Sequence, residues 1–415
     1  MALGGIWSSP RFLFYATGST INNLGNQLYF LVLPLLVYSM TQSALNMSVM
    51  AVCEALPQVL LSLFAGALVD RLSRRTVIFA ALCFQAFCCA LISTLFSVGL
   101  LEVWMLYLLG TCLAIGQVFL RTAEFATIPA MFPDRKLEAS AGLSSCFTAT
   151  TIFGPLLAGI LIAAFEYQTL LIINALTYFA PILLCLITRI PHESLGGVRS
   201  ISQVLIDTRN GLRWILDSRI LVSIAIVMGL SNLADSGILT VVLFHLKDEL
   251  AMADNLISYV LMVNGLGMLI GTILPPRLKR LARGKMMLLA LLLNNFGVAL
   301  FLIPVAWIAP IALFIGSIGG MMLHISYTVM IQESVPNEML GRVNGAMRTL
   351  IAITFPLSTS MLGSITGFLG SETAFLTAVS LSILPLLIIL KGPVYRFSQQ
   401  QLNEEVVNRS SNMIS

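Results

Sequence analysis

The chain has 415 residues, of which 58% are hydrophobic and only 10% are charged, and its formal net charge is +4. Soluble globular proteins carry about 25% charged residues, so this composition excludes a large water-exposed surface and indicates a protein surrounded by lipid. The basic residues lie in short loops between apolar runs rather than on one exposed face, which argues against a nucleic-acid partner.

Apolar runs of about 20 residues, each long enough to span a bilayer, predict twelve helices and no cleavable signal peptide before them. The expected ranges are 12–38, 47–69, 76–98, 102–125, 139–164, 168–188, 219–245, 256–275, two helices within 286–332 that are separated by a turn near Pro304–Pro310, 343–368 and 372–391. The predicted fold class is therefore an all-α membrane protein with twelve transmembrane helices.

The order of these helices predicts four parts. Residues 1–188 form an N-terminal six-helix bundle, 189–218 a cytosolic linker, 219–391 a C-terminal six-helix bundle and 392–415 a cytosolic tail. Within the linker, apolar residues at helical spacing between Ile201 and Leu216 predict an amphipathic helix on the inner leaflet. A disordered linker with chance periodicity is the alternative.

Basic residues set the expected orientation. With the N-terminus inside, all of the 23 Lys and Arg residues except Lys247 fall on cytosolic loops, tails or helix ends. This asymmetry follows the positive-inside rule. It predicts a multi-pass protein of the inner or plasma membrane with both termini in the cytosol.

Similar motifs recur about 200 residues apart and predict two pseudo-symmetric halves. Gly66 opens a loop that ends in Arg74 and Arg75, and Gly271 opens a weaker copy. Pro155 in the fifth predicted helix corresponds to Pro356 in the eleventh. Internal duplication of a six-helix unit is one way to build a transporter whose site lies between the repeats.

The loop after the second predicted helix carries Gly66-x3-Asp70-Arg71-x-Ser73-Arg74-Arg75. This pattern resembles the signature loop of the major facilitator superfamily, and the resemblance covers the whole chain as topology. It implies the major facilitator fold and a conformational latch at the cytosolic face. The residues assigned to this latch are Gly66, Asp70, Arg71, Arg74, Arg75, Arg121 and Glu124. The alternative is that these basic residues only anchor the loop. The second copy has Pro275 in place of Asp70, so it is expected to serve as an anchor at most.

The fifth predicted helix carries Gly154-Pro155-Leu-Leu-Ala158-Gly159. It resembles the helix 5 motif of drug and proton antiporters in the same superfamily, although Thr150 stands where that motif has a further glycine. The segments around Glu124–Pro133 and Gln332–Gly345 resemble the branch that contains macrolide-efflux proteins and enterobactin exporters. The resemblance implies export of an amphipathic cargo.

Two acids inside predicted spans are candidates for proton coupling, because ionisable groups in a bilayer are costly and a buried acid can exchange a proton near neutral pH. These are Asp235 and Glu54. Asp235 has a structural alternative, a hydrogen bond near Asn232, and Glu54 has the alternative of reaching the outer interface. Further polar residues on helices 1, 4, 7 and 10 are candidates for contact with the cargo. They are Asn22, Asn23, Asn26, Gln27, Gln117, Asn232, His324 and Tyr327.

The sequence thus predicts a proton-coupled exporter of a drug, macrolide or siderophore that works by alternating access, as a monomer. Its expected partners are the lipid bilayer, a small-molecule cargo and protons or another coupling ion. No cofactor, metal or enzymatic activity is expected, because the chain lacks a nucleotide-binding loop and its three histidines lie far apart. The alternatives are an importer or lysolipid flippase of the same fold and, from other classes, a membrane receptor or a membrane-embedded enzyme.

Overall fold

The computed structural model describes residues 6–69, 72–187, 201–278, 281–303 and 305–395. Eleven helical segments in this part of the chain are long and apolar enough to cross a membrane. A twelfth segment, α12 (Arg283–Leu300), carries Arg283 and Lys285 in its first turn and two asparagines in its second half. These polar residues lower its hydropathy, but α12 still packs along α13 (Ile308–Ser334) and completes the twelve passes.

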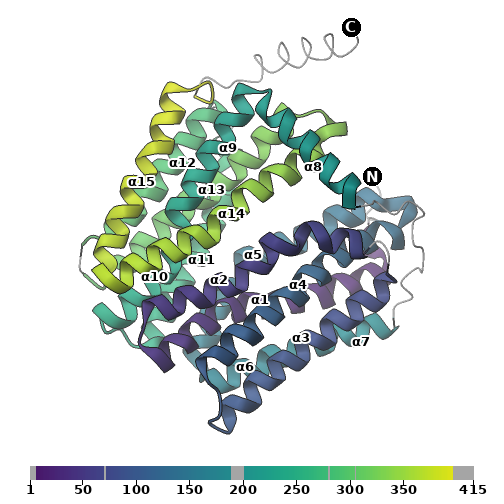
Figure 1. Cartoon of the computed structure of the whole chain (residues 1–415), viewed down its shortest axis with the longest axis horizontal. Helices are drawn as coiled ribbons and strands as arrows, with labels where there is room; N and C mark the ends of the chain where they lie inside the picture. The colour runs from purple at the N-terminus through teal and green to yellow at the C-terminus, as the bar shows by residue number, and fades with distance from the viewer. Residues whose placement is uncertain (1–5, 70–71, 188–200, 279–280, 304, 396–415) are drawn as a thin grey trace. The chain divides into compact units, whose positions relative to one another are not determined.

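Two compact units divide the chain. Unit 1 comprises residues 1–204 together with 254–262, and unit 2 comprises 205–253 together with 263–415. The four-part division proposed from the sequence stays a prediction, although the all-helical, two-bundle fold class is confirmed (Figure 1).

Unit 1 begins with a short 3-10 turn, η1 (Ile6–Ser8), and ends at the last apolar helix before the linker. Its elements in chain order are α1 (Pro10–Thr41), α2 (Ala44–Val69), α3 (Arg74–Ser97), α4 (Val103–Met131), η2 (Pro133–Arg135), α5 (Lys136–Ala164), α6 (Tyr167–Thr177) and α7 (Phe179–Ile187). Helix α1 packs against α2, α5, α6 and α7, so its side chains form the centre of the unit. Because the sixth predicted helix is interrupted at Tyr178, it is two helices rather than one.

Unit 2 begins in α8 (Ile201–Leu216), the helix expected within the linker. Its other elements are α9 (Arg219–Asp235), α10 (Ile238–Phe244), the π-turn η3 (His245–Glu249), α11 (Asp254–Arg277) from residue 263 on, α12, α13, α14 (Asn337–Leu369) and α15 (Ser371–Lys391). The helix predicted over 219–245 is confirmed as one apolar span, Arg219–Glu249, with a local irregularity at Ser236–Gly237 and a π-turn at its end. Figure 1 shows α9, α12, α13 and α15 running alongside one another, in agreement with their contacts.

The end of α8 packs on protein. Ile215 belongs to the buried core of unit 2, and a Cβ atom at Gly211 would lie only 2.4 Å from the carbonyl oxygen of Arg342 in α14. Glycine therefore allows α8 to touch the backbone of α14. The predicted contact of α8 with the inner leaflet stays a prediction.

Candidate functional site

The predicted polar face of α1 is buried inside the protein. Ser19, Asn22 and Asn23 are each less than 8% exposed. Asn23 donates to the Ser19 hydroxyl at 3.4 Å, and the Tyr178 hydroxyl, at the interruption between α6 and α7, donates to Asn26 Oδ1 at 3.2 Å. The break in the sixth helix therefore places a hydroxyl on this face.

Two glycines bring other helices close to the polar face of α1. A Cβ atom at Gly25 would lie 2.2 Å from the hydroxyl oxygen of Thr177, and one at Gly154 would lie 2.5 Å from Cγ of Gln27. Gly154 belongs to the α5 motif, which also places Pro155 inside the helix and leaves Gly159 buried. Small residues at helix interfaces permit such close approach, so this motif packs directly against a residue of the predicted cargo face.

Helix α4 carries three polar residues of the predicted site, spaced so that they share one face: Gln117, Arg121 and Glu124. The guanidinium carbon of Arg121 lies 3.8 Å from the centre of the Phe147 ring, a cation–π contact with α5. Glu124 hydrogen-bonds Ser19 of α1 and lies in electrostatic range of Arg121. These residues therefore join α4 to its neighbours within unit 1.

The predicted latch falls partly outside the described residues. Asp70 and Arg71 lie outside them, and Gly66 lies in α2. Arg74 is buried at the start of α3, and Arg75 donates to the carbonyl oxygen of Leu186 in α7 at 3.0 Å. The pairing of Arg74 with Glu124 and the latch itself stay predictions.

Unit 2 holds an ion pair at the corresponding place. Arg283 and Glu333 each follow Arg74 and Glu124 by about 210 residues. The Arg283 Nη2 atom lies 3.0 Å from Glu333 Oε1, and its Nε atom lies 3.4 Å from Oε2, so both nitrogens face the carboxylate. Such paired geometry favours arginine over lysine. Comparison of the two halves of the sequence showed that Pro275 replaces Asp70, but it missed the pair of Arg283 and Glu333. The equal spacing of Arg74 and Glu124 in the first half could have indicated this pair.

The acid Glu54 is buried, although the sequence left open that it reaches the outer interface. Both of its carboxylate oxygens are inaccessible to solvent and lack a hydrogen-bond partner among the described residues. Its electrostatic neighbour is Tyr29 of α1. Leaving such a group unsatisfied costs about 1–3 kcal/mol, and more when it is charged.

The second acid, Asp235, ends α9 at a break in the helix. The break at Ser236–Gly237 is held by α14, because the Gly237 amide donates to the hydroxyl of Ser358 at 3.0 Å. Asn232, one turn earlier, donates to the carbonyl oxygen of Ile351 in α14 at 3.3 Å. Interrupted helices at membrane depth are tolerated where protein groups satisfy the freed backbone, and they are common at transporter sites.

Asn294 of α12 is the partner of Asp235, and the sequence analysis missed it. Its side-chain amide donates to Asp235 Oδ2. Helix α13 approaches Asn294 closely, since a Cβ atom at Gly319 would lie 2.3 Å from the Asn294 backbone nitrogen. Two adjacent asparagines, Asn294 and Asn295, in an apolar run were the available signal, because polar side chains are rare in such runs.

His324 and Tyr327, predicted to face the cargo, lie one turn apart on α13. Their ring centres are 6.3 Å apart, with His324 exposed and Tyr327 buried. Arg348 of α14 lies in electrostatic range of both. Arg348 was not among the predicted residues. The sequence does not indicate that α14 brings Arg348 near His324 and Tyr327 of α13.

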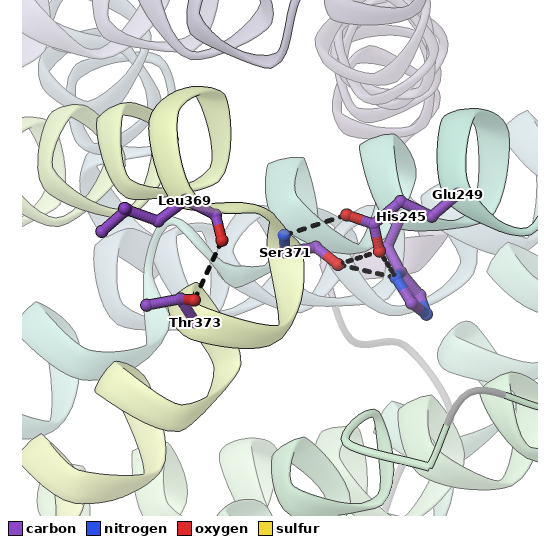
Figure 2. A network of polar contacts seen from close by, with 5 residues as sticks. All are labelled: His245, Glu249, Leu369, Ser371 and Thr373. Atoms are coloured by element: carbon purple, nitrogen blue, oxygen red, sulfur yellow. Dashed lines mark hydrogen bonds and ion pairs between the residues drawn. The ribbon is translucent and has the colours of Figure 1, made fainter.

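A second polar network lies where η3 meets the start of α15 (Figure 2). His245 Nδ1 lies 2.6 Å from Glu249 Oε2 and 2.7 Å from the Ser371 hydroxyl. Glu249 also accepts from the Ser371 amide at 2.9 Å and from its hydroxyl at 2.5 Å. The His245 side chain is buried and makes edge-to-face contacts with Phe301 and Phe375, whose rings stack on each other.

Glu249 therefore caps the N-terminus of α15, where a negative charge is stabilising. Thr373, two residues further on, donates to the carbonyl oxygen of Leu369 and closes the same turn. His245 and Glu249 are four residues apart, so their side chains lie on the same side of this helical turn.

No cluster of three or more histidine, cysteine, aspartate or glutamate side chains that could hold a metal ion occurs in the described ranges. The polar side chains instead form hydrogen-bonding surfaces on helices, which suits recognition and movement of a solute.

Comparisons with known proteins agree with this architecture. The family model described as Major Facilitator Superfamily matches residues 15–359 and 224–404. The chain is 27% identical over 407 residues to the uncharacterized MFS-type transporter YfiS of Bacillus subtilis (strain 168), covering 92% of this chain and 93% of that protein. It is 28% identical over 388 residues to the multidrug efflux pump Tap of Mycolicibacterium fortuitum, covering 88% and 91%. The crystal structure of the nucleoside transporter NupG has a similar fold, with a TM-score of 0.73, 12% identity and coverage of 94% and 100%.

Proposed function

Because this chain belongs to the Major Facilitator Superfamily and is a multi-pass membrane transporter, we propose that it exports amphipathic small molecules by alternating access, in exchange for protons that move inward down their gradient. The observation that carries the proposal is Asp235, a half-buried acid inside an apolar span, bonded to the amide of Asn294 at a break between two helices. The Asp235 carboxylate accepts a hydrogen bond from Asn294, and a small movement of either helix can break it.

The proposed coupling step uses this hydrogen bond. An amide N–H stabilises the ionised carboxylate. When the helices of unit 2 shift and the Asn294 contact is lost, an unpaired charge in a low-dielectric environment becomes costly, and Asp235 takes up a proton. Restoring the contact releases the proton. Glu54 is the second candidate, and it has no comparable donor among the described residues.

Two observations support export. The α5 motif of Gly154 and Pro155 packs against Gln27 of α1, and one relative of comparable length bears the name of a multidrug efflux pump. The positive-inside pattern of the sequence supports a cell-membrane location with both termini in the cytosol.

Import is the second candidate, because alternating access can move a cargo in either direction. It would appear as protein-dependent uptake in place of efflux.

The experiment is cargo accumulation in cells and inverted vesicles that carry the protein. Macrolides, siderophores and lipophilic cations are tested with and without a proton uncoupler, for the wild type and for Asp235→Asn and Asp70→Asn. The proposal predicts uncoupler-sensitive efflux that is lost in Asp235→Asn. Uptake that depends on the protein would instead establish the importer, and unchanged accumulation of every compound with well-expressed protein would sink the multidrug proposal.

A further inference from the structure

Buried polar side chains of unit 1 form one continuous face. On α1, Tyr15, Ser19, Asn22, Asn26 and Tyr29 are spaced by four, three, four and three residues, which aligns them along the helix. Fourteen residues of helix rise by about 21 Å. The face therefore extends through much of the thickness of a bilayer.

Helix α4 lies antiparallel to this face. Near one end, a Cβ atom at Gly110 would lie 3.2 Å from the Tyr29 hydroxyl, so glycine leaves room for that group. Near the other end, Glu124 hydrogen-bonds Ser19. Gln117 stands two helical turns before Glu124 on the same side of α4, and this places it between the two ends.

Helix α2 adds a charge at the Tyr29 end. Glu54 lies in electrostatic range of Tyr29, and Met50, one helical turn before it on α2, borders Gly110 together with the Tyr29 hydroxyl. Tyr29 is 8% exposed, so the group beside this acid is almost entirely withdrawn from solvent.

Most atoms left unsatisfied on this face accept hydrogen bonds. Within the described residues, no partner is found for Asn22 Oδ1, Gln117 Oε1, either carboxylate oxygen of Glu54 or the hydroxyls of Tyr15 and Tyr29; the one unsatisfied atom on the α1 part of this face that only donates is Asn26 Nδ2. Turning an amide over would exchange its oxygen for an NH2 group, but an ionised carboxylate has only acceptors. Buried polar groups are nearly always bonded, so several orphans on one face indicate a ligand that donates.

We propose that this face of α1, α2 and α4 binds a cationic amine group of the cargo, with Glu54 as its counter-charge. An ammonium or aromatic amine supplies the N–H donors that the carboxylate and amide oxygens lack, and the Tyr29 ring adds a cation–π surface. An anionic ligand would face Glu54 with the wrong sign. The assignment names the cargo class of the proposed exporter and rests on that proposal.

The two acids then have different tasks. Asp235 has an amide donor that a movement can remove, which suits a proton carrier. Glu54 has no donor among the described residues and lies in range of the Tyr29 ring, which suits a cation that arrives with its own donors. Because its oxygens are buried, the cargo reaches Glu54 in the state of the cycle that opens this face.

The test is equilibrium binding to the purified full-length protein in lipid nanodiscs. Three dyes or ions are compared: ethidium, a cation with two amino groups; tetraphenylphosphonium, a cation with no N–H; and the anion fluorescein. We expect ethidium to bind most tightly, tetraphenylphosphonium more weakly and fluorescein least. Glu54→Gln should weaken ethidium binding about tenfold, which corresponds to about 1.4 kcal/mol, and Glu54→Asp should restore part of it.

Ser48→Ala is the matched control, because Ser48 is also a buried α2 residue with an unpartnered hydroxyl in the described part of the chain but carries no charge. It should bind ethidium like the wild type. Tyr29→Phe removes only the hydroxyl and should weaken ethidium several-fold, which keeps the test decisive if Glu54→Gln does not fold. A melting-temperature increase in ligand-free Glu54→Gln would support the proposal, since the orphan charge is gone.

Equal ethidium affinity in the wild type, Glu54→Gln and Tyr29→Phe would overturn the assignment, as would tighter binding of fluorescein or no binding of ethidium to the wild type. This failure differs from failure of the exporter proposal. Intact Glu54-dependent binding without any uncoupler-sensitive efflux would contradict export alone, whereas efflux that is independent of Glu54 would contradict the cation site alone.

Discussion

Unit 1 and unit 2 each contain an acid inside an apolar span, but the surroundings of the two acids differ. Asp235 in unit 2 ends a helix, receives a hydrogen bond from Asn294 and lies beside a break that α14 holds. Glu54 in unit 1 sits within an unbroken helix and has no hydrogen-bond partner among the described residues. The position of an acid in an apolar run therefore does not define its role. Its partners do, because the hydrogen bond of Asp235 can be broken by a movement, whereas Glu54 can accept hydrogen bonds from a ligand.

The largest expected effect is a loss of efflux that depends on the charge of the cargo for Glu54 but not for Asp235. Asp235→Asn should reduce uncoupler-sensitive efflux to background for every cargo, because a neutral amide cannot carry the proton. Glu54→Gln should reduce efflux of cations while leaving uncharged cargoes near the wild-type rate. The measurement is initial efflux rate from loaded cells, and equal losses for all cargoes in both variants would break the comparison.

The next effect concerns the partner of Asp235. Asn294→Leu removes the donor, and we expect it to lower efflux about tenfold, because a charged hydrogen bond contributes about 1.5–3 kcal/mol. Initial rates at several external pH values check this, since loss of coupling should flatten the pH dependence. Asn295→Leu, at the adjacent position, is the control and should stay near wild type; the reverse order of effects would refute the role of Asn294.

A packing change tests how α13 supports Asn294. Gly319→Ala should destabilise unit 2 by about 1–3 kcal/mol, because its new Cβ would lie 2.3 Å from a backbone nitrogen. Gly229→Ala is the matched control, since no atom lies within 4 Å of a Cβ there, and removing a mid-helix glycine should stabilise by about 0.5–1 kcal/mol. Thermal unfolding in detergent measures both, and similar melting temperatures would contradict the close packing.

The smallest expected effect lies in the network of Figure 2. Glu249→Gln keeps the size of the side chain but weakens the cap on α15 and the contact with His245. We expect a loss of about 1 kcal/mol in stability with transport preserved. Glu372→Gln, an exposed residue of the same helix start, should have no measurable effect. A transport defect in Glu249→Gln at normal stability would show that this network belongs to the coupling machinery.

The sequence was sufficient for the twelve passes and the bundle architecture, because each pass needs a long apolar run that few other structures require. It did not reveal the interruption at Tyr178 or the break at Ser236–Gly237, where no proline marks the helix end. Those breaks depend on partners far along the chain, such as Ser358.

Residue types were also easier to predict than their partners. The buried polar face of α1 followed from helical spacing, and the glycine motif of α5 followed from its resemblance. The contacts of Asp235 with Asn294 and of Arg283 with Glu333 join residues 50 or more positions apart. Helix packing brings these pairs together, and a single sequence does not show which distant helices pack against each other.

Cargo-driven proton movement in proteoliposomes tests the central claim most directly. The purified protein is reconstituted with a pH-sensitive dye in the lumen, and a cargo such as ethidium is added on one side. The account predicts a cargo-dependent change of luminal pH with the wild type, its absence with Asp235→Asn, and its dependence on Glu54 for cationic cargo. Equal proton movement with wild type and Asp235→Asn would contradict the proposed role of Asp235.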